Sequence, residues 1–370
     1  MTKIRKIYKK DIESLLLETQ FWNHNFLAIT KHRLLAHLHN PNLENDDIVL
    51  ILGYLNNELV GYMGVFIDTI IIKNENQKIG WLSTWWVHPK TKGSGIGREI
   101  LNVMYAENNG KIGISQFTAS AKRVYDKSGY FVDLKQNIGV KAVLKTNFST
   151  IILELKPQLS VLKPILKMAD FAINSVVSIK QYFNKKALNQ NLKSVKIEYL
   201  NAIDAETSQF INSNNNNHLT KKSDAFFNWL KQYQWVQEAP LLAFTEKNKY
   251  EFSMVDNSFN IYLMKIKLEN QIIGFLVLQK RNQIMKVLFA YFDSNKHSHY
   301  ITDVIKLQAI TQNIHEIIAY DAFICNNFKK SNVFLYNRKK VKNSIISQAF
   351  NQNNFEKIIM NYGDGDCCFA

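Results

Sequence analysis

The fold is decided by residues 87–98, which read Val87-His88-Pro89-Lys90-Thr91-Lys92-Gly93-Ser94-Gly95-Ile96-Gly97-Arg98. The apolar run before them has the pattern of a strand, and residues 95–108 carry apolar side chains at helical spacing. The three glycines let backbone N–H groups approach a ligand closely. A helix N-terminus adds unpaired N–H donors and about half a positive charge. The stretch therefore predicts a phosphate-binding loop, to which Lys92 and Arg98 add formal charge.

Three kinds of nucleotide loop compete for this stretch. A P-loop ends in Gly-Lys-Ser/Thr, which is not found here. A dinucleotide-binding loop stands early in a βαβ unit with an acidic residue about twenty positions later, whereas three strands are expected before residue 87. The acyl-CoA pattern Arg/Gln-x-x-Gly-x-Gly/Ala matches residues 92–97, with Lys92 in the first place. A plain glycine-rich turn before a surface helix is the structural alternative.

The segments around the loop predict a mixed α/β architecture. Two apolar runs around Asn56-Asn57 are typical of a β-hairpin, and the other runs alternate or repeat with the periods of strands and helices. The expected elements are strand 2–8, helices 9–22 and 25–39, strands 48–55, 59–67 and 79–87, helix 95–108, strand 112–117, helix 119–128, and strands 130–134 and 139–148.

The second half of the chain repeats this order. LNNELVGYMGV (55–65) and LENQIIGFLVL (268–278) share a leucine, a polar turn, an apolar pair, a glycine and an aromatic residue, which favours a duplicated fold. Ser294–Tyr300 stands where the loop would recur but has no glycine, so it predicts a degenerate copy. The expected elements are strand 195–201, helix 223–236, three strands within 260–293 with turns at Glu269-Asn270 and Arg281-Asn282, helix 300–313, strand 316–324, helix 326–350 and strand 355–362.

A basic amphipathic segment joins the two halves. Residues 156–186 carry apolar side chains at helical spacing among several lysines, with Pro164 near the start. One interpretation is a domain-bridging helix packed on protein, and the other is peripheral contact with anionic lipid through residues 160–186. The expected division is a domain at 1–150, a linker helix at 151–194 and a second domain at 195–370.

A second motif lies downstream of the loop, Ala121-Lys122-Arg123-Val124-Tyr125-Asp126-Lys127-Ser128-Gly129-Tyr130. With it, residues 1–150 resemble the GCN5-related N-acetyltransferase (GNAT) family, whose element is Ala-x-x-x-Tyr-x-x-x-Gly-Phe; Tyr130 replaces the Phe. The resemblance implies the acyl-CoA N-acyltransferase fold, a mixed α/β sheet that is duplicated here. It also implies acetyl-CoA as co-substrate and no metal.

The resemblance assigns roles to residues. Backbone amides around residues 93–98 would cradle the pyrophosphate, and a backbone N–H near Val87 would polarise the thioester. Tyr125 would be the catalytic acid for the leaving thiolate, because a free tyrosine pKa of about 10 is close to that of the thiol. A half-buried tyrosine that packs on the sheet is the alternative. The candidate acyl-CoA-binding residues are Trp85, Val87, Lys92, Gly93, Ser94, Gly95, Ile96, Gly97 and Arg98.

The general base is not evident. Many family members carry a glutamate on the strand before the loop, but residues 80–87 read GWLSTWWV and contain no carboxylate. Ser83 or Thr84 could hold a water. The other candidates are His24, His88, Asp46, Asp47 and Asp68, of which His88 also fits a plain turn position.

Three tryptophans stand close together on that strand. Trp81 and Trp85 are expected to share one face and Trp86 to take the other, because successive strand residues alternate. Sheet core is one interpretation, and an aromatic wall for an acceptor such as a sugar ring is the other.

Composition limits the classes of protein. The 370 residues carry a net charge of +15 that is spread along the chain, without the arginine and aromatic stripe of a nucleic-acid site. Three cysteines without a paired framework predict a reducing, cytoplasmic location. The first residues lack the apolar region of a signal peptide, and no long apolar run predicts a membrane span.

Two further clusters have plain alternatives. His297 and His299 beside Asp293 could bind a metal, but a solvated loop is favoured. The acidic turn at residues 361–368 lacks the further ligands of a calcium loop. An ordinary turn is favoured there, with contact to an acceptor amine as the alternative.

The sequence thus predicts an acetyl-CoA-dependent N-acetyltransferase with tandem domains. Its acceptor would be a small amine, with an amino sugar of bacterial surface-polysaccharide synthesis as the narrower hypothesis. Two alternatives stay open: a Fem-type aminoacyl transferase that uses charged tRNA, and a non-catalytic binding module with a relic CoA loop.

Overall fold

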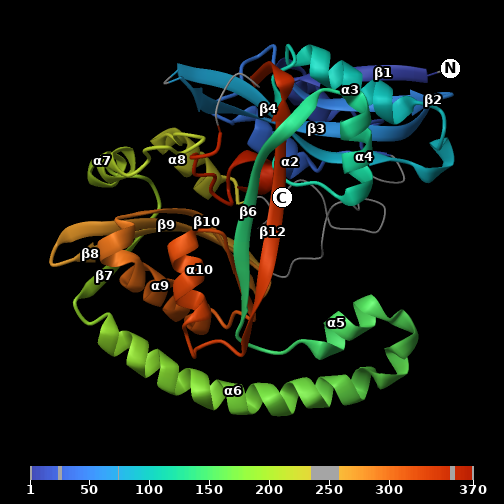
Figure 1. Ribbon diagram of the computed structural model, residues 1–370. Helices are drawn as coiled ribbons and strands as arrows, with labels where there is room; N and C mark the ends of the chain where they lie inside the picture. The colour runs from blue at the N-terminus through green and yellow to red at the C-terminus, as the bar shows by residue number, and fades with distance from the viewer. Residues whose placement is uncertain (1, 24–26, 74, 235–257, 351–354, 369–370) are drawn as a thin grey trace. The chain divides into compact units, whose positions relative to one another are not determined.

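The computed structural model describes residues 2–23, 27–73, 75–234, 258–350 and 355–368 (Figure 1). They form two compact units that alternate along the chain. Unit 1 comprises Met1–Asn137, Asn215–Phe259 and Lys342–Ala370, and unit 2 comprises Ile138–Asn214 and Asn260–Val341.

Unit 1 is built on strands in the order β1-β2-β3-β4-β5-β12. Its ladders are antiparallel except the one between β4 and β5, which is parallel. The elements are β1 (Thr2–Tyr8), α1 (Ile12–Leu17), α2 (Lys31–Leu38), β2 (Ile48–Leu55), β3 (Glu58–Ile72), β4 (Glu75–Val87), α3 (Ile96–Glu107), β5 (Ile112–Ile114), α4 (Ala119–Ser128) and α8 (Asp224–Gln232), with the 3-10 turns η1 (Lys9–Asp11), η2 (Pro89–Thr91), η5 (Gln348–Phe350) and η6 (Gly365–Cys368).

Unit 2 has the matching order β7-β8-β9-β10-β11-β6. Its β10 and β11 are parallel, and β11 runs antiparallel to β6. The elements are α5 (Phe148–Leu155), the 3-10 segment η3 (Pro157–Leu162), α6 (Lys163–Asn191), β7 (Val195–Leu200), α7 (Ala205–Ser213), β8 (Phe259–Leu268), β9 (Gln271–Arg281), β10 (Ile284–Phe292), α9 (Ser294–Thr311), β11 (Glu316–Ala319) and α10 (Ala322–Lys329).

Each unit takes its last strand from the other half of the chain. Strand β6 (Phe131–Val143) follows α4 of unit 1, but its residues 140–143 pair with β11 of unit 2. Strand β12 (Tyr336–Ser347) follows α10 of unit 2, but Ile345 and Ile346 pair with β5 of unit 1. The units therefore do not follow the expected boundaries 1–150, 151–194 and 195–370, because local composition does not show which strand a segment pairs with.

Several expected elements of the second half are wrong. The helix expected over 326–350 is α10 followed by the strand β12, whose second half is mostly buried. The strand expected over 355–362 is not formed; among the described residues of that segment, Ile359 makes an isolated bridge to His218. In the first half, the two strands expected between 130 and 148 are the single strand β6.

The duplication is visible in details that the two units share. Asn56-Asn57 and Glu269-Asn270 both turn their hairpins with two positive φ angles, 51° and 67° in the first and 49° and 67° in the second. A Cβ added to Gly61 would lie 3.0 Å from Ile100 Cδ1 of α3. One added to Gly274 would lie 2.3 Å from Ile301 Cδ1 of α9. The glycine of the repeated sequence therefore lets a helix approach the third strand of each unit.

A buried ion pair fixes one later segment of the chain onto the sheet of unit 1. Lys222 Nζ binds the Asp68 carboxylate on β3, and both side chains are almost fully buried. Asn42 Nδ2 donates to the same carboxylate over 3.2 Å. Beside this pair, Ile71 N donates to Leu219 O over 2.9 Å, so the segment before Lys222 also continues the backbone hydrogen bonding of β3.

We expect Lys222→Met to destabilise the protein by about 3–5 kcal/mol, because it leaves the Asp68 carboxylate buried and uncompensated. Adding Asp68→Leu to that variant should restore most of the loss. Urea unfolding followed by tryptophan fluorescence measures both. Equal destabilisation of the single and double variants would show that the pair does not set this stability.

Candidate functional site

The predicted phosphate loop joins β4 to α3 as expected from the sequence. Gly93 and Gly95 have φ angles of 89° and 82°, which side chains other than glycine rarely adopt. A Cβ at either position would meet nothing within 4 Å. The space over the loop is therefore open, and Gly95 is the N-cap of α3, whose first N–H groups lack helical acceptors.

A cavity of about 810 Å³ opens over this loop. That volume lies within the range of ligand-binding clefts. Lys92, Arg98 and Lys127 line it, and the lining residues that the structure describes include no carboxylate. The surroundings therefore favour an anionic ligand. Of the predicted acyl-CoA-binding residues, the cavity brings together Trp85, Val87, Lys92, Gly93, Gly95, Ile96, Gly97 and Arg98.

Ser94 is the predicted residue that does not line the cavity. Its Oγ accepts a hydrogen bond of 3.4 Å from Ile96 N, so it supports the start of the helix. Sequence reasoning missed Lys127. The residue lies within the second motif, three positions after Val124, so both share a face of α4 and reach the cavity together.

Strand β4 carries a bulge just before the loop. Tyr62 pairs with Trp86 and Gly64 with Ser83, so Thr84 and Trp85 face a single residue of β3. Thr84 has a φ of 50°, a strained conformation for a β-branched residue. Unit 2 has a register shift in the corresponding strand, between Val287 and Phe289 of β10. The bulge redirects the end of β4, where Trp85 lines the cavity.

Tyr125 lies beside this bulge on α4. Thr118 caps the helix by accepting a hydrogen bond from Ala121 N, and Gly129 ends it with a φ of 72°. The Tyr125 ring is 5.3 Å from that of Trp85 and 5.4 Å from that of Phe131. Its side chain is 4% exposed. Burial, and then the charge of Asp366, raises the Tyr125 pKa above its usual value, so the hydroxyl stays protonated.

The acidic turn near the C-terminus reaches the same region of unit 1. Ser115 Oγ, just beyond β5, donates to Asp366 Oδ1 and lies 3.3 Å from Cys367 Sγ. A Cβ on Gly365 would lie 2.6 Å from Ser115 Cβ and 3.2 Å from the Trp81 ring. The turn therefore packs closely on β4 and β5, where the parallel ladder consists of Gly80–Ile112 and Trp81–Gly113.

Several opposing effects act on the pKa of Asp366. Burial raises the Asp366 pKa, whereas the Ser115 hydrogen bond and the charges of Arg33 and Lys342 lower it; burial dominates. Arg33 is 2% exposed, and its Nη2 donates to Ser83 Oγ over 2.7 Å. The Asp366 carboxylate thus interacts electrostatically both with the Arg33 guanidinium and with the protonated phenol of Tyr125.

A second aspartate holds the turn in place. Asp364 accepts hydrogen bonds from Thr220 Oγ1 over 2.6 Å and from Asn361 N over 2.7 Å. Burial raises its pKa to about 6, although the Lys222 charge opposes that rise. Asn361 Nδ2 lies 2.9 Å from His218 Nδ1. The described turn is therefore positioned by polar contacts.

The structure gives other roles to the base candidates. Asp68 pairs with Lys222, and Ser83 accepts from Arg33. Asp46 pairs with Lys10 at 2.7 Å on the surface. His24 lies outside the described residues.

Two more candidates make local contacts, and one of them, His88, also lines the cavity over the loop. Asp47 Oδ2 is 3.0 Å from Lys78 Nζ and accepts from Glu44 N over 2.7 Å. His88 Nδ1 accepts a hydrogen bond from Lys90 N over 3.1 Å, so this side chain caps the turn that follows it.

The tryptophans divide between core and cavity. Trp81 is fully buried, and Trp86 stacks on Tyr62 with ring centroids 5.7 Å apart. Only Trp85 of the three lines the described cavity. Trp81 therefore belongs to the sheet core, and the aromatic-wall interpretation is left with Trp85.

In unit 2, the residues considered as a metal site lie at the start of a helix. His297 and His299 belong to α9, so the expected loop is wrong. Across the part of the chain that the structure describes, no group of three His, Cys, Asp or Glu side chains could hold a metal ion.

The part of the chain that contains the loop and Tyr125 is similar to known proteins. Residues 9–130 match the model of the acetyltransferase (GNAT) family. A GCN5-related N-acetyltransferase from Kribbella flavida has the same fold, with a TM-score of 0.50 and 9% identity over 94% of this chain and 71% of that one. No curated protein is significantly similar in sequence.

Two further solved structures are similar over 94% of this chain. A GCN5-related N-acetyltransferase from Anabaena variabilis has a TM-score of 0.47 and 9% identity over 72% of its own length. A tandem GNAT protein from the clavulanic acid biosynthesis pathway has a TM-score of 0.48 and 7% identity over 98% of its length. Together with the loop and the mixed sheet, the family match confirms the resemblance for residues 9–130, which carry an acetyltransferase (GNAT) family domain.

Proposed function

We propose that the protein is an acetyl-CoA-dependent N-acetyltransferase that acts on a small amine. The observation that carries this proposal is the cavity over the Gly93–Gly95 loop, lined by three cations and reaching the bulged end of β4. Backbone N–H groups at the start of α3 and the side chains of Lys92, Arg98 and Lys127 would bind a pyrophosphate there.

The remaining chemistry is the transfer itself. Acetyl-CoA supplies the thioester, whose C–S bond breaks as a C–N bond to the amine forms. Tyr125 would donate its hydroxyl proton to the leaving sulfur. Burial keeps the phenol protonated for this step, and by raising the pKa it also makes Tyr125 a weaker acid than the free side chain. The amine must lose a proton in turn. Because the described lining of the cavity contains no carboxylate, a carboxylate that accepts this proton must come from beyond that lining.

We assign that base to Asp366. Its carboxylate influences Tyr125, is anchored by Ser115 and carries a pKa raised by burial. A raised pKa makes a carboxylate a stronger base near neutral pH. The sequence left open that the acidic turn contacts the acceptor amine, and this assignment makes that contact catalytic. Asp366 would then take the place of the carboxylate that residues 80–87 lack.

An amino sugar is the narrower proposal for the acceptor. Trp85 at the cavity offers one aromatic face to a sugar ring. Amino sugars therefore belong in the first panel of amines.

Acetyl-CoA should raise the melting temperature of the protein. At about 100 times its Kd, a ligand adds about 2.7 kcal/mol, or on the order of 5–10 °C for a domain of this size. Gly95→Asp should abolish the shift, because it places a negative charge where the pyrophosphate would lie. Gly95→Asn is the control, because asparagine has the shape of aspartate without its charge. This variant should retain a larger part of the thermal shift. No shift with the wild-type protein would contradict the proposal; a shift justifies assaying free-thiol release with the amine panel.

Tyr125→Phe should lower kcat by about 10²–10⁴, the usual contribution of a general acid, and leave the acetyl-CoA thermal shift intact. Tyr130→Phe is the matched control. The Tyr130 hydroxyl donates to Asn102 Oδ1 over 3.0 Å and the ring stacks on Tyr105, so the kcat of this variant should equal that of the wild type. Unchanged kcat in Tyr125→Phe would remove this residue from the mechanism.

Asp366→Asn should lower kcat and remove the acidic limb of the pH–rate profile. A general base works only when deprotonated, so wild-type activity should rise as pH increases through its pKa. Burial places that limb above the usual range of an aspartate. Asp126→Asn, an exposed change on α4, is the control. A limb that persists in Asp366→Asn would assign the base elsewhere.

A further inference from the structure

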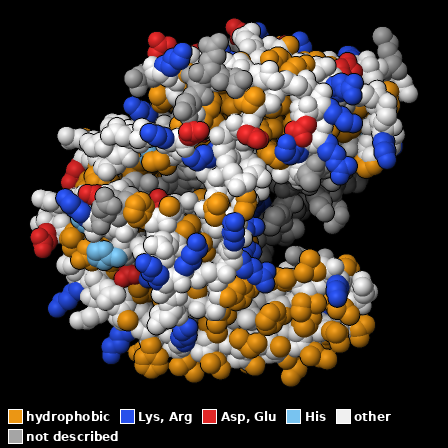
Figure 2. Space-filling model, viewed as in Figure 1, with side chains coloured by type: hydrophobic (Ala, Val, Ile, Leu, Met, Phe, Trp, Pro, Cys, Tyr) orange, Lys and Arg blue, Asp and Glu red, His pale blue; other side chains and the backbone are white. Residues whose placement is uncertain are grey.

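Unit 2 exposes a large apolar surface along α5, η3 and α6. Of the twenty large apolar side chains that are exposed among the described residues, twelve lie between Phe148 and Phe183. Figure 2 shows these orange side chains gathered over α5 and α6, at the bottom of the view. Such a large patch marks an interaction surface rather than ordinary surface scatter.

The patch follows one side of α6, which we call the α6 outer face. It consists of Ile165, Met168, Phe171, Val176, Ile179 and Phe183, which are 62–77% exposed. They recur at three- to five-residue spacing, and most fall on one stripe of a helix. The buried residues of α6, among them Val177 and Leu188, lie on the opposite side. The helix is thus attached to its own unit by one side and presents apolar groups to the outside with the other.

Asp170 fixes this arrangement from the buried side. Its carboxylate accepts hydrogen bonds of 2.8 Å from Phe148 N and from Ser149 N, the first residues of α5. Burial raises the Asp170 pKa and these hydrogen bonds lower it, with a net lowering. The Asp170 carboxylate therefore holds the start of α5 against α6. Because this side chain is buried, its charge does not face the exposed apolar side of the helix.

Lysines border the α6 outer face. At about 100° per residue, Lys167 and Lys185 lie to one side of the apolar stripe and Lys180 to the other. The segment 148–191 holds six lysines against two acidic residues, Glu154 and Asp170. Long lysine stems can lie along apolar surface while their charges reach outward.

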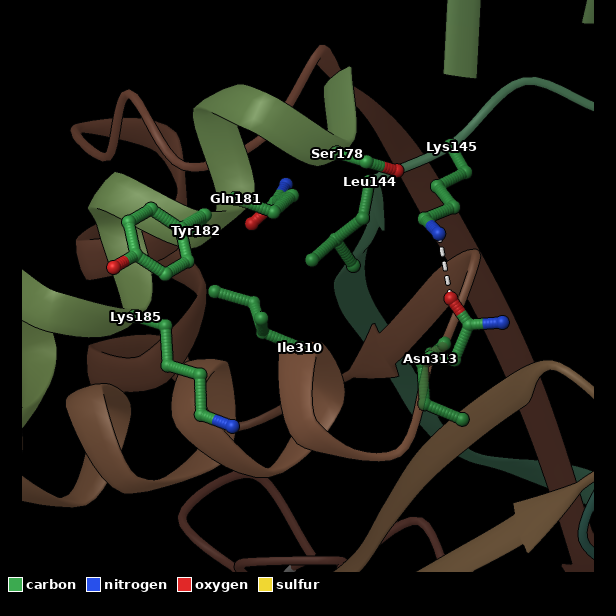
Figure 3. Close-up of a pocket in the computed structure, with 9 residues that line it drawn as sticks. Leu144, Lys145, Ser178, Gln181, Tyr182, Lys185, Ile310 and Asn313 are labelled. Atoms are coloured by element: carbon green, nitrogen blue, oxygen red, sulfur yellow. Dashed lines mark hydrogen bonds between the residues drawn. The ribbon is translucent and has the colours of Figure 1, made fainter. Parts of the chain in front are cut away.

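A small cavity stands at the border of this face (Figure 3). It has a volume of about 190 Å³ and lies among α6, the end of α9 and the segment after β6. Figure 3 shows Lys145 and Lys185 on opposite sides of it, with Leu144 and Ile310 between them. Lys145 Nζ donates to Asn313 Oδ1 over 2.5 Å. The described lining has two ammonium groups and no carboxylate.

We propose that the α6 outer face lies on a bilayer containing anionic lipid, whose phosphates the bordering lysines would meet. The aromatic and aliphatic groups would enter the boundary between headgroups and acyl chains, and the flanking lysines would meet the anionic headgroups. Within the described residues no helix has the length and apolarity to span a membrane. The contact therefore lies along the surface.

Charge separates this occupant from a second copy of the chain. Two α6 outer faces packed together would bring lysine borders against lysine borders, with no exposed carboxylate on α6 to pair with them. Placing like charges opposite one another across an interface costs binding free energy. An anionic bilayer neutralises the same lysines, so the lipid surface fits the patch better.

Vesicle sedimentation tests the proposal with the full chain. The wild-type protein should bind vesicles of equal phosphatidylglycerol and phosphatidylcholine, and bind pure phosphatidylcholine much more weakly. Phe171→Ser with Ile179→Ser should weaken binding at least tenfold, because two inserted side chains are lost. Lys180→Gln with Lys185→Gln should weaken anionic binding about thirtyfold, since each lysine near such a surface contributes roughly fivefold.

Matched controls lie on α10 of the same unit and at Lys330, the residue that follows it. Phe323→Ser and the pair Lys329→Gln with Lys330→Gln change exposed residues of the same types and should bind vesicles as the wild type does. Circular dichroism and melting temperature confirm that every variant is folded. Equal loss in the controls, or no preference for anionic vesicles, would overturn the proposal. So would a dimer by light scattering that the Phe171 and Ile179 changes convert to monomer.

Discussion

The exchange of last strands is the constraint on which the rest of this structure depends. Strand β5 of unit 1 has three residues, and its partner on one side is β12, which the chain reaches only after passing through unit 2. Because β12 returns to unit 1, the segment that follows it also returns there. The acidic turn with Asp364 and Asp366 is thereby brought against Trp81 of β4 and Ser115, where the charge of Asp366 acts on Tyr125.

Buried polar contacts give that returning segment its position. Apolar packing alone would let a short turn slide, whereas each hydrogen bond to a buried carboxylate accepts few geometries. The Lys222–Asp68 pair fixes one neighbouring segment, and Asp364 joins the turn to it through Thr220. In our mechanism this arrangement lets a residue near the end of the chain take the proton that the strand before the loop cannot accept.

Much of the fold could be predicted because its signals are local. The loop glycines, the Asn56-Asn57 turn and the repeated Gly61 and Gly274 each report a nearby backbone requirement. The failures are non-local. The basic, amphipathic pattern of β12 is compatible with a helix, and pairing with distant strands, β5 among them, makes it a strand. In the same way, no pattern near Arg33 announces that its guanidinium is buried against Ser83.

The site shows the same division between local and distant information. Lys127 could have been found from helical spacing, because it shares a face with Val124 inside a motif already recognised. Asp366 could not, since its partner Ser115 lies 251 positions earlier. Strand alternation predicts that Trp81 and Trp85 share one face, but the β4 bulge at Thr84 lies between them and breaks that alternation.

The returning strand also has a consequence for synthesis on the ribosome. Ser344 Oγ donates to Ser115 O, 229 positions earlier, so the edge of β5 must wait for its partner while those residues are made. At typical translation rates the wait is roughly ten to fifty seconds. An unpaired strand edge is a template for pairing with other chains. The nascent protein therefore passes through a long interval in which a chaperone would protect it, and a rare codon within unit 2 would lengthen that interval.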